Sequence, residues 1–158
     1  MSKSKILNEY ITQNIDSAYR FAFTYVKNRE DAEDIVSESV IKAINHVGSL
    51  KNPQNVKPWF YKIVANTALN FIKKKNRTVS IEDSFVMPSA TDDYSEINLE
   101  SILNGLEQKY KEVVVLRFLE DMKIVEIAQV LGINENTVKT RLYKALKILR
   151  AEMEDCEV

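Results

Sequence analysis

The chemistry available to this 158-residue sequence comes mainly from cationic and amide side chains that recur at helical spacing over residues 59–77 and 134–150. Cations bind phosphates, amides bond to base edges and aromatic rings stack on bases, so this combination is typical of a nucleic-acid surface. Within 134–150, five bases stand against Glu135 alone. A solvated basic helix face is the alternative interpretation of each stretch, and the surrounding pattern has to separate the two.

Residues that usually carry catalysis are scarce. His46 is the only histidine and Cys156 the only cysteine, so the chain cannot assemble a zinc cluster or a Cys/His nucleophile pair in a core. It has no glycine-rich phosphate loop. Asp92 and Asp93 adjoin each other, and we expect them to bind a divalent ion weakly at best. The sequence predicts a protein that is not an enzyme, with no catalytic residue, metal or other cofactor.

The composition predicts a helical globular protein. Only three Gly and three Pro favour long helices, and shares of 45% hydrophobic and 28% charged residues are typical of globular domains. No apolar run approaches the roughly 20 residues that span a bilayer. The N-terminus leads into a polar helix and not a signal-peptide core, and a lone cysteine supports no disulfide framework. We expect no membrane insertion and a cytoplasmic location.

Charge divides the chain into three segments although the net charge is −1. Residues 1–77 carry 13 Lys and Arg against 7 Asp and Glu, whereas residues 78–98 carry five acids and no base. The acidic stretch contains Pro88 and lacks a sustained helical period, as a linker does. We expect an all-α fold with two small helical domains, 1–77 and 99–158, joined by the acidic linker 78–98.

Three helices are expected in the first domain. Apolar residues recur every three or four positions over about residues 4–26, which indicates one amphipathic helix. Asn28 suits the N-cap of a second helix, with Gly48 as its C-cap. A loop over 49–57 then leads to a third helix over 58–77, which begins with a proline in its first turn.

The second and third predicted helices differ in the chemistry of their surfaces. The second has an acidic face, which repels phosphates but suits a protein partner that bears bases, and it contains Asp31, Glu33, Asp34 and Glu38. The third has a face suited to single-stranded DNA, made of Trp59, Lys62, Asn66, Asn70 and Lys73, followed by Lys74, Lys75 and Arg77. Two simpler interpretations remain. Trp59 can be a core residue, and the charges at the start of the second helix and at the end of the third can serve only to complement the helix dipoles.

The strongest local pattern begins at residue 124 and ends at residue 150. Ala128 offers the small side chain needed where two helices cross, and Gly132 can take a positive φ in a tight turn. A buried stripe of the second helix is expected at Val138, Leu142, Ala145 and Leu149. The opposite side carries Asn136, Lys139, Thr140, Tyr143, Lys144 and Lys147. Side chains near the start of such a helix can reach base edges in the major groove, so we predict a DNA-binding helix-turn-helix.

One further helix is expected before this motif, over residues 107–119. By propensity alone, the run from Val113 to Leu116 would also suit a strand. Charged residues at helical spacing on both sides of the run favour a buried helix instead.

Three segments carry a resemblance to a known family: DAEDIVSE at 31–38, PWFYKIVAN at 58–66, and YKEVVVLR at 110–117 continued by TVKTRL at 137–142. In this order they resemble the extracytoplasmic-function class of RNA polymerase sigma factors. The resemblance covers about residues 6–77 and 99–151. It implies a factor that binds core RNA polymerase and promoter DNA and directs promoter-specific transcription initiation. It also admits an anti-sigma protein as a further partner.

The resemblance also implies a role for each surface. Polymerase contacts would be Asp31, Asp34, Ser37, Glu38 and Ile41, although the family commonly has Gln where Ser37 stands. The loop 49–57 would capture a flipped base of the melted minus-ten element. The whole minus-ten surface would comprise Asn52, Asn55, Trp59, Lys62, Asn66, Asn70, Lys73 and Lys74. The minus-thirty-five duplex would be bound by Asn136, Thr137, Lys139, Thr140, Arg141, Tyr143, Lys144 and Lys147.

A transcriptional regulator that binds an operator without acting as a polymerase subunit is the main alternative. It would account for the helix-turn-helix pattern over 124–150. It would leave the acidic second helix and the amide-rich third helix without a role. The two functions differ in whether the protein needs polymerase to select a promoter.

Overall fold

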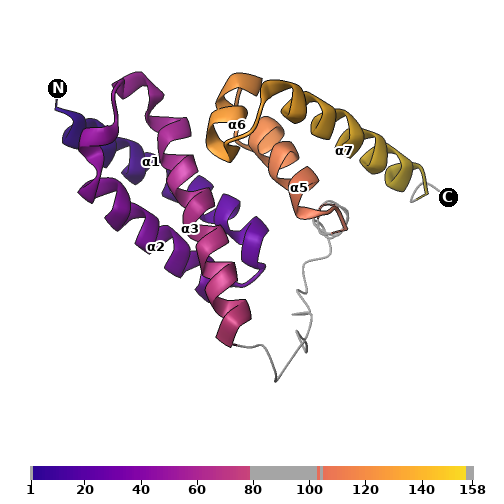
Figure 1. Cartoon of the computed structure of the whole chain (residues 1–158), viewed down its shortest axis with the longest axis horizontal. Helices are drawn as coiled ribbons and strands as arrows, with labels where there is room; N and C mark the ends of the chain where they lie inside the picture. Colours follow the sequence, from indigo (N-terminus) through magenta and orange to yellow (C-terminus); the bar gives the residue numbers. More distant parts are fainter. Residues whose placement is uncertain (1, 79–102, 104, 156–158) are drawn as a thin grey trace.

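The computed structural model describes residues 2–78, 103 and 105–155, and within them every regular element is helical (Figure 1). In chain order these elements are α1 (Lys3–Val26), α2 (Arg29–Asn45), two 3-10 turns (Val47–Ser49 and Pro53–Asn55), α3 (Val56–Thr78), α5 (Gln108–Val114), a π-helical turn (Val115–Leu119), α6 (Ile124–Leu131) and α7 (Glu135–Asp155). The expected all-α class is confirmed. The predicted linker lies outside the described residues apart from Thr78.

Helices α1, α2 and α3 pack together as a first unit, and local signals set most of their ends. The Asn28 side chain accepts a hydrogen bond from Asp31 N at 3.1 Å and caps α2, as predicted. The prediction that Gly48 ends α2 was wrong. The helix ends at Asn45 with His46 as its C-cap, and a 3-10 turn follows in which the Ser49 hydroxyl donates to His46 O at 2.8 Å. This closure needs no left-handed residue.

The loop before α3 is shorter than expected. The Asn52 side chain accepts from Gln54 N at 3.0 Å and caps a 3-10 turn, which runs directly into α3 at Val56. Pro58 therefore stays in the first turn, where a missing N–H costs nothing.

Helices α5, α6 and α7 form a second unit. Its valine run is helical, and Val113, Val114 and Val115 are all buried, so the prediction of a buried helix is confirmed. The end of the predicted helix, residues 115–119, forms a π-helical turn. Gly132 has φ 66° between α6 and α7, as the tight-turn prediction required. Within α7 the predicted stripe faces inward, and its buried members are Val138, Leu142 and Ala145.

The two units share one apolar core, because α3 packs on α1 and α2 along one side and on α6 along another (Figure 1). Phe21 and Tyr61 of the first unit belong to the same buried cluster as Leu116, Met122 and Ile127 of the second. Burying each large apolar side chain contributes about 1.5–3 kcal/mol. The junction is therefore held in large part by apolar burial.

A buried carboxylate adds polar contacts to this junction. Glu120 is 4% exposed and lies between α1 and α3. Its Oε1 accepts from Arg20 Nη2 at 2.8 Å, its Oε2 accepts from the Tyr61 hydroxyl at 2.6 Å, and Lys57 Nζ donates to its backbone oxygen. Both carboxylate oxygens are thus paired, as a buried charge requires. Burial and the hydrogen bond to Glu120 raise the pKa of Tyr61.

Candidate nucleic-acid and protein interfaces

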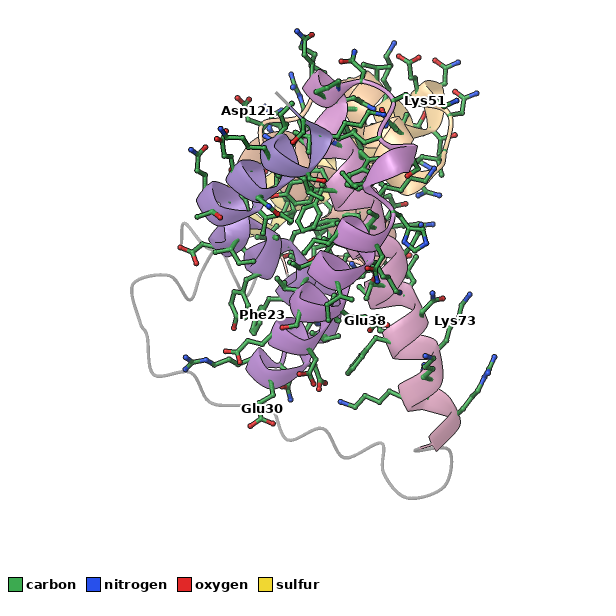
Figure 2. The ribbon with its side chains drawn as sticks, turned by 90° about the vertical axis from the view of Figure 1, so that its left-hand side faces the viewer. Phe23, Glu30, Glu38, Lys51, Lys73 and Asp121 are labelled. Carbon is green, nitrogen blue, oxygen red and sulfur yellow. The ribbon has the colours of Figure 1, made fainter. Side chains whose placement is uncertain are left out.

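The predicted minus-ten residues lie along one side of the first unit. Lys62, Asn66, Asn70 and Lys73 recur every turn of α3 and are exposed, and Lys74 adjoins them. Figure 2 shows Lys73 projecting from the lower part of α3, while Lys51 of the preceding loop lies at the opposite end of the unit. Exposed amides and ammonium groups on one strip can bond to bases and phosphates together.

Trp59 links this strip to the loop before it. The ring packs against the core while staying half-exposed, and its Nε1 donates to the Ser49 hydroxyl at 3.2 Å. Leu50 is fully buried and anchors the same loop. Asn52 is exposed and Asn55 half-buried, so the loop presents an amide on an anchored backbone.

The acidic residues of α2 do not form one continuous contact surface. Asp31 is paired with Lys75 of α3 at 2.7 Å, an interaction between residues far apart in sequence that no local pattern indicates. Asp34 and Glu38 are exposed, and Glu38 lies 3.4 Å from Lys42 one turn later. Figure 2 shows Glu38 along α2, well away from Glu30 at its end.

A groove of about 880 Å³ lies between α1 and α2. Ser37 and Ile41, two predicted polymerase contacts, line it, and Ile41 is 60% exposed. Sequence reasoning missed the contribution of α1, which adds Ile15 and Tyr19 to the apolar wall. Periodicity gave no signal for this role, because Ile15 recurs at the same spacing as Ala18 and Ala22, which are buried in the core. An exposed apolar groove with charged rims suits a protein partner.

The predicted minus-thirty-five residues lie on α7. Asn136, Lys139, Thr140, Tyr143, Lys144 and Lys147 are exposed, whereas Thr137 and Arg141 are half-buried. Tyr143 is 75% exposed, which is high for an aromatic side chain. The Asn134 side chain accepts from Asn136 N at 2.7 Å at the start of the helix. Two hollows flank these first turns, one shared with α6 and one with α5.

Arg141 is held near a carboxyl group whose protonation is perturbed. Burial raises the pKa of Glu112 on α5 to about 7, while the Arg141 guanidinium lowers it.

Lys111 of α5 is a second perturbed group, at the junction between the two units, where its Nζ donates to Thr24 O at 3.3 Å. Burial and the neighbouring Lys27 lower the pKa of Lys111 to about 8.

Among the described residues, none of the helices combines the length and apolar character needed to cross a membrane. In the same part of the chain, no group of three or more His, Cys, Asp or Glu side chains lies close enough to hold a metal ion.

Comparison with known proteins assigns both halves of the chain. The family description "Sigma-70 region 2" matches residues 10–78, and "Sigma-70, region 4" matches residues 96–149. RNA polymerase sigma factor SigV of Bacillus subtilis (strain 168) is 44% identical over 146 residues, which cover 90% of this chain and 88% of SigV. ECF RNA polymerase sigma factor SigW of the same organism is 26% identical, covering 89% of this chain and 84% of SigW.

The fold is also found among solved structures. The sigma factor RpoE of Bartonella quintana, in complex with the anti-sigma factor NepR, has a TM-score of 0.78 at 21% identity, covering 93% of this chain and 96% of that chain. CnrH in complex with the cytosolic domain of CnrY has a TM-score of 0.69 at 18% identity, covering 96% and 89%.

The chain therefore belongs to the sigma-70 family of RNA polymerase sigma factors. Within that family it is of the extracytoplasmic-function class. It binds core RNA polymerase and directs promoter-specific transcription initiation, as the sequence predicted. The alternative of an operator-binding regulator is not favoured.

Proposed function

We propose that this sigma factor has three binding surfaces on two domains, and that each surface binds a different partner. Residues 1–77 bind polymerase and the minus-ten element, residues 78–98 link the domains, and residues 99–158 bind the minus-thirty-five duplex. The observation that carries the proposal is the separation of surface chemistry: an apolar groove with acidic neighbours on α1 and α2, an amide and lysine strip on α3, and a basic face on α7.

Polymerase binds at the groove between α1 and α2. Ser37 and Ile41 line that groove, and the exposed Asp34 and Glu38 lie on the same helix. A partner helix with an apolar stripe and basic flanks matches this combination. Asp31 contributes by fixing Lys75 and the end of α3 against α2.

The minus-ten element binds α3 and the loop before it. Extruding a base from a duplex costs a few kcal/mol, and a protein that captures the unpaired base offsets that cost. The loop is suited to capture because Leu50 is buried and Trp59 bonds to Ser49. The full contact set comprises Asn52, Asn55, Trp59, Lys62, Asn66, Asn70, Lys73 and Lys74.

The minus-thirty-five duplex binds the exposed side of α7. Asn136 and Lys139 lie in its first turns, where a recognition helix reaches base edges. Gly132 sets the turn that presents this helix. The full contact set comprises Asn136, Thr137, Lys139, Thr140, Arg141, Tyr143, Lys144 and Lys147.

The protein acts in the cytoplasm, together with polymerase, and carries no catalytic activity of its own. An anti-sigma protein is a further partner, which is supported by the complex of the similarly folded RpoE with NepR.

Transcription from a random promoter library with core polymerase tests the proposal. The purified protein is expected to select promoters that share two spaced sequence elements, and to bind duplex DNA weakly without polymerase. Tight operator binding by the protein alone, without initiation from any template, would contradict it.

A further inference from the structure

The hollow between α5 and α7 has features that the recognition helix alone does not explain. It has a volume of about 310 Å³, and its wall includes Lys109, Tyr110, Thr137, Thr140, Arg141 and Lys144. The first two belong to α5, for which the sequence predicted no DNA contact. The four α7 residues follow helical spacing, so they lie on the flank of α7 that is turned toward α5.

The chemistry of this hollow suits an anion. Its lining holds three cations and three hydroxyls and contains no Asp or Glu. Lys109 Nζ lies 5.1 Å from the centre of the Tyr110 ring, a cation–π contact that orients the ammonium group. Among the described residues it pairs with the Glu107 carboxylate, at 3.8 Å. Both side chains of that pair are at least half-exposed, so it holds Lys109 only weakly.

The cations differ in how they are engaged within the protein. Arg141 is half-buried and faces Glu112, whereas Lys144 is exposed and forms no ion pair among the described residues. Lys109 and Lys144 are therefore the cations that an external anion would meet first.

A helix with its side chains is roughly 10–12 Å wide and fills a major groove about 12 Å wide. Its flanks then face the two phosphate backbones. Lys139 lines the hollow on the α6 side and Asn136 lines both hollows, so these residues of the first turns can face base edges. The flank of α7 with Lys144, beside Lys109 of α5, is then placed to face a backbone.

We propose that Lys109 and Tyr110 of α5, together with Lys144 of α7, form a site for a phosphate of the minus-thirty-five duplex. This inference rests on the proposed binding of that duplex by α7. The site fixes the register of α7 on the DNA and carries no sequence information, because a phosphate is the same at every base pair. In this site the ammonium group of Lys109 binds the phosphate, and the Tyr110 ring orients that ammonium group.

The test measures promoter binding by the holoenzyme, made from the full chain and core polymerase, over a series of salt concentrations. Lys109→Ala should weaken binding by the same factor on matched and altered minus-thirty-five sequences. It should also reduce the slope of log affinity against log salt by about one, the value for one lost phosphate contact. Lys109→Arg should restore most of the slope, and Lys5→Ala, an exposed change at the start of α1 outside every proposed contact surface, should leave it unchanged.

Two results overturn the inference: an unchanged salt slope in Lys109→Ala, or a change in sequence preference at the upstream element. A different result would show that α7 does not bind the minus-thirty-five duplex at all. In that case the wild-type holoenzyme itself would show no dependence on the upstream element, whatever the behaviour of the Lys109 variants.

Discussion

The two basic helices, α3 and α7, are held in the molecule in different ways. α3 packs against α1 and α2 on one side and against α6 on another, which leaves one strip of side chains exposed (Figure 1). α7 packs through one buried stripe on α5 and α6, and Tyr143 on its exposed side is 75% accessible.

This difference matches the two forms of DNA that a promoter presents. An unpaired base must be held at a fixed point, which favours residues on a helix braced from two sides. A duplex receives a projecting helix in its major groove, which favours exposure along most of the helix. The same residue types, Asn and Lys, can thus serve different tasks because their helices are packed differently.

The largest expected effect tests the bracing of α3. Glu120→Ala leaves the Arg20 guanidinium and the Tyr61 hydroxyl without their partner at the buried junction. Arg20 is 49% exposed and can be rehydrated, but the Tyr61 hydroxyl stays buried, and an unsatisfied buried donor costs about 1–3 kcal/mol, so the free energy of unfolding should fall by that amount. Urea denaturation followed by circular dichroism measures it.

Glu9→Ala, an exposed change on α1, is the control and should have little effect. A wild-type unfolding curve for Glu120→Ala would show that apolar packing alone holds α3 against the second unit.

A second effect tests the support of α7. Because burial raises the pKa of Glu112 from 4.5 to about 7, the folded state binds more protons than the unfolded state between those values. Wild-type stability should therefore fall as pH rises from 4.5 to 7. Glu112→Gln should remove this dependence and gain stability on the order of 2 kcal/mol above pH 7, less any loss of attraction to Arg141.

Denaturation at a series of pH values measures that change, with Glu154→Gln at the exposed end of α7 as the control. An unchanged pH profile in Glu112→Gln would mean that Glu112 is solvated and does not restrain Arg141.

A smaller effect separates protein binding from DNA binding. Glu38→Lys reverses an exposed charge beside the groove of α2 and should weaken core polymerase binding by about 1 kcal/mol without unfolding the chain. Titration with labelled polymerase measures the affinity. Glu30→Lys, at the end of α2 and outside the groove lining, should bind nearly normally. Equal affinity of Glu38→Lys and wild type would move polymerase binding away from this part of α2.

The sequence predicted those parts of the fold that depend on nearby residues. Asn28 caps α2 through a residue three positions away, and Gly132 has the positive φ that its turn requires. Gly48 misled the prediction because glycine permits a left-handed helix end but does not require one. The valine run from 113 to 115 was separable from a strand only by the charges around it.

The parts that could not be predicted depend on residues far apart in the chain. The Asp31–Lys75 pair joins α2 to α3, and the Arg20–Glu120 pair joins α1 to the segment before α6, so charge patterns within one helix carry no signal for them. The grooves raise the same problem, because Ile15 and Lys109 gain their surroundings from another helix. The exposed face of a single helix could be predicted from the periodicity of the sequence. A surface built by two helices could be recognised only in the structure.

The central claim is that α3 selects the downstream element and α7 the upstream one. Sequencing the transcripts that holoenzyme makes from a random promoter library tests it, with Asn66→Ala and Lys139→Ala compared against wild type. Asn66→Ala should relax preference only in the minus-ten element, and Lys139→Ala only in the minus-thirty-five element, by about 1–3 kcal/mol for each lost base contact. If both variants relaxed the same element, or if neither changed any preference, the division of labour between the two helices would be refuted.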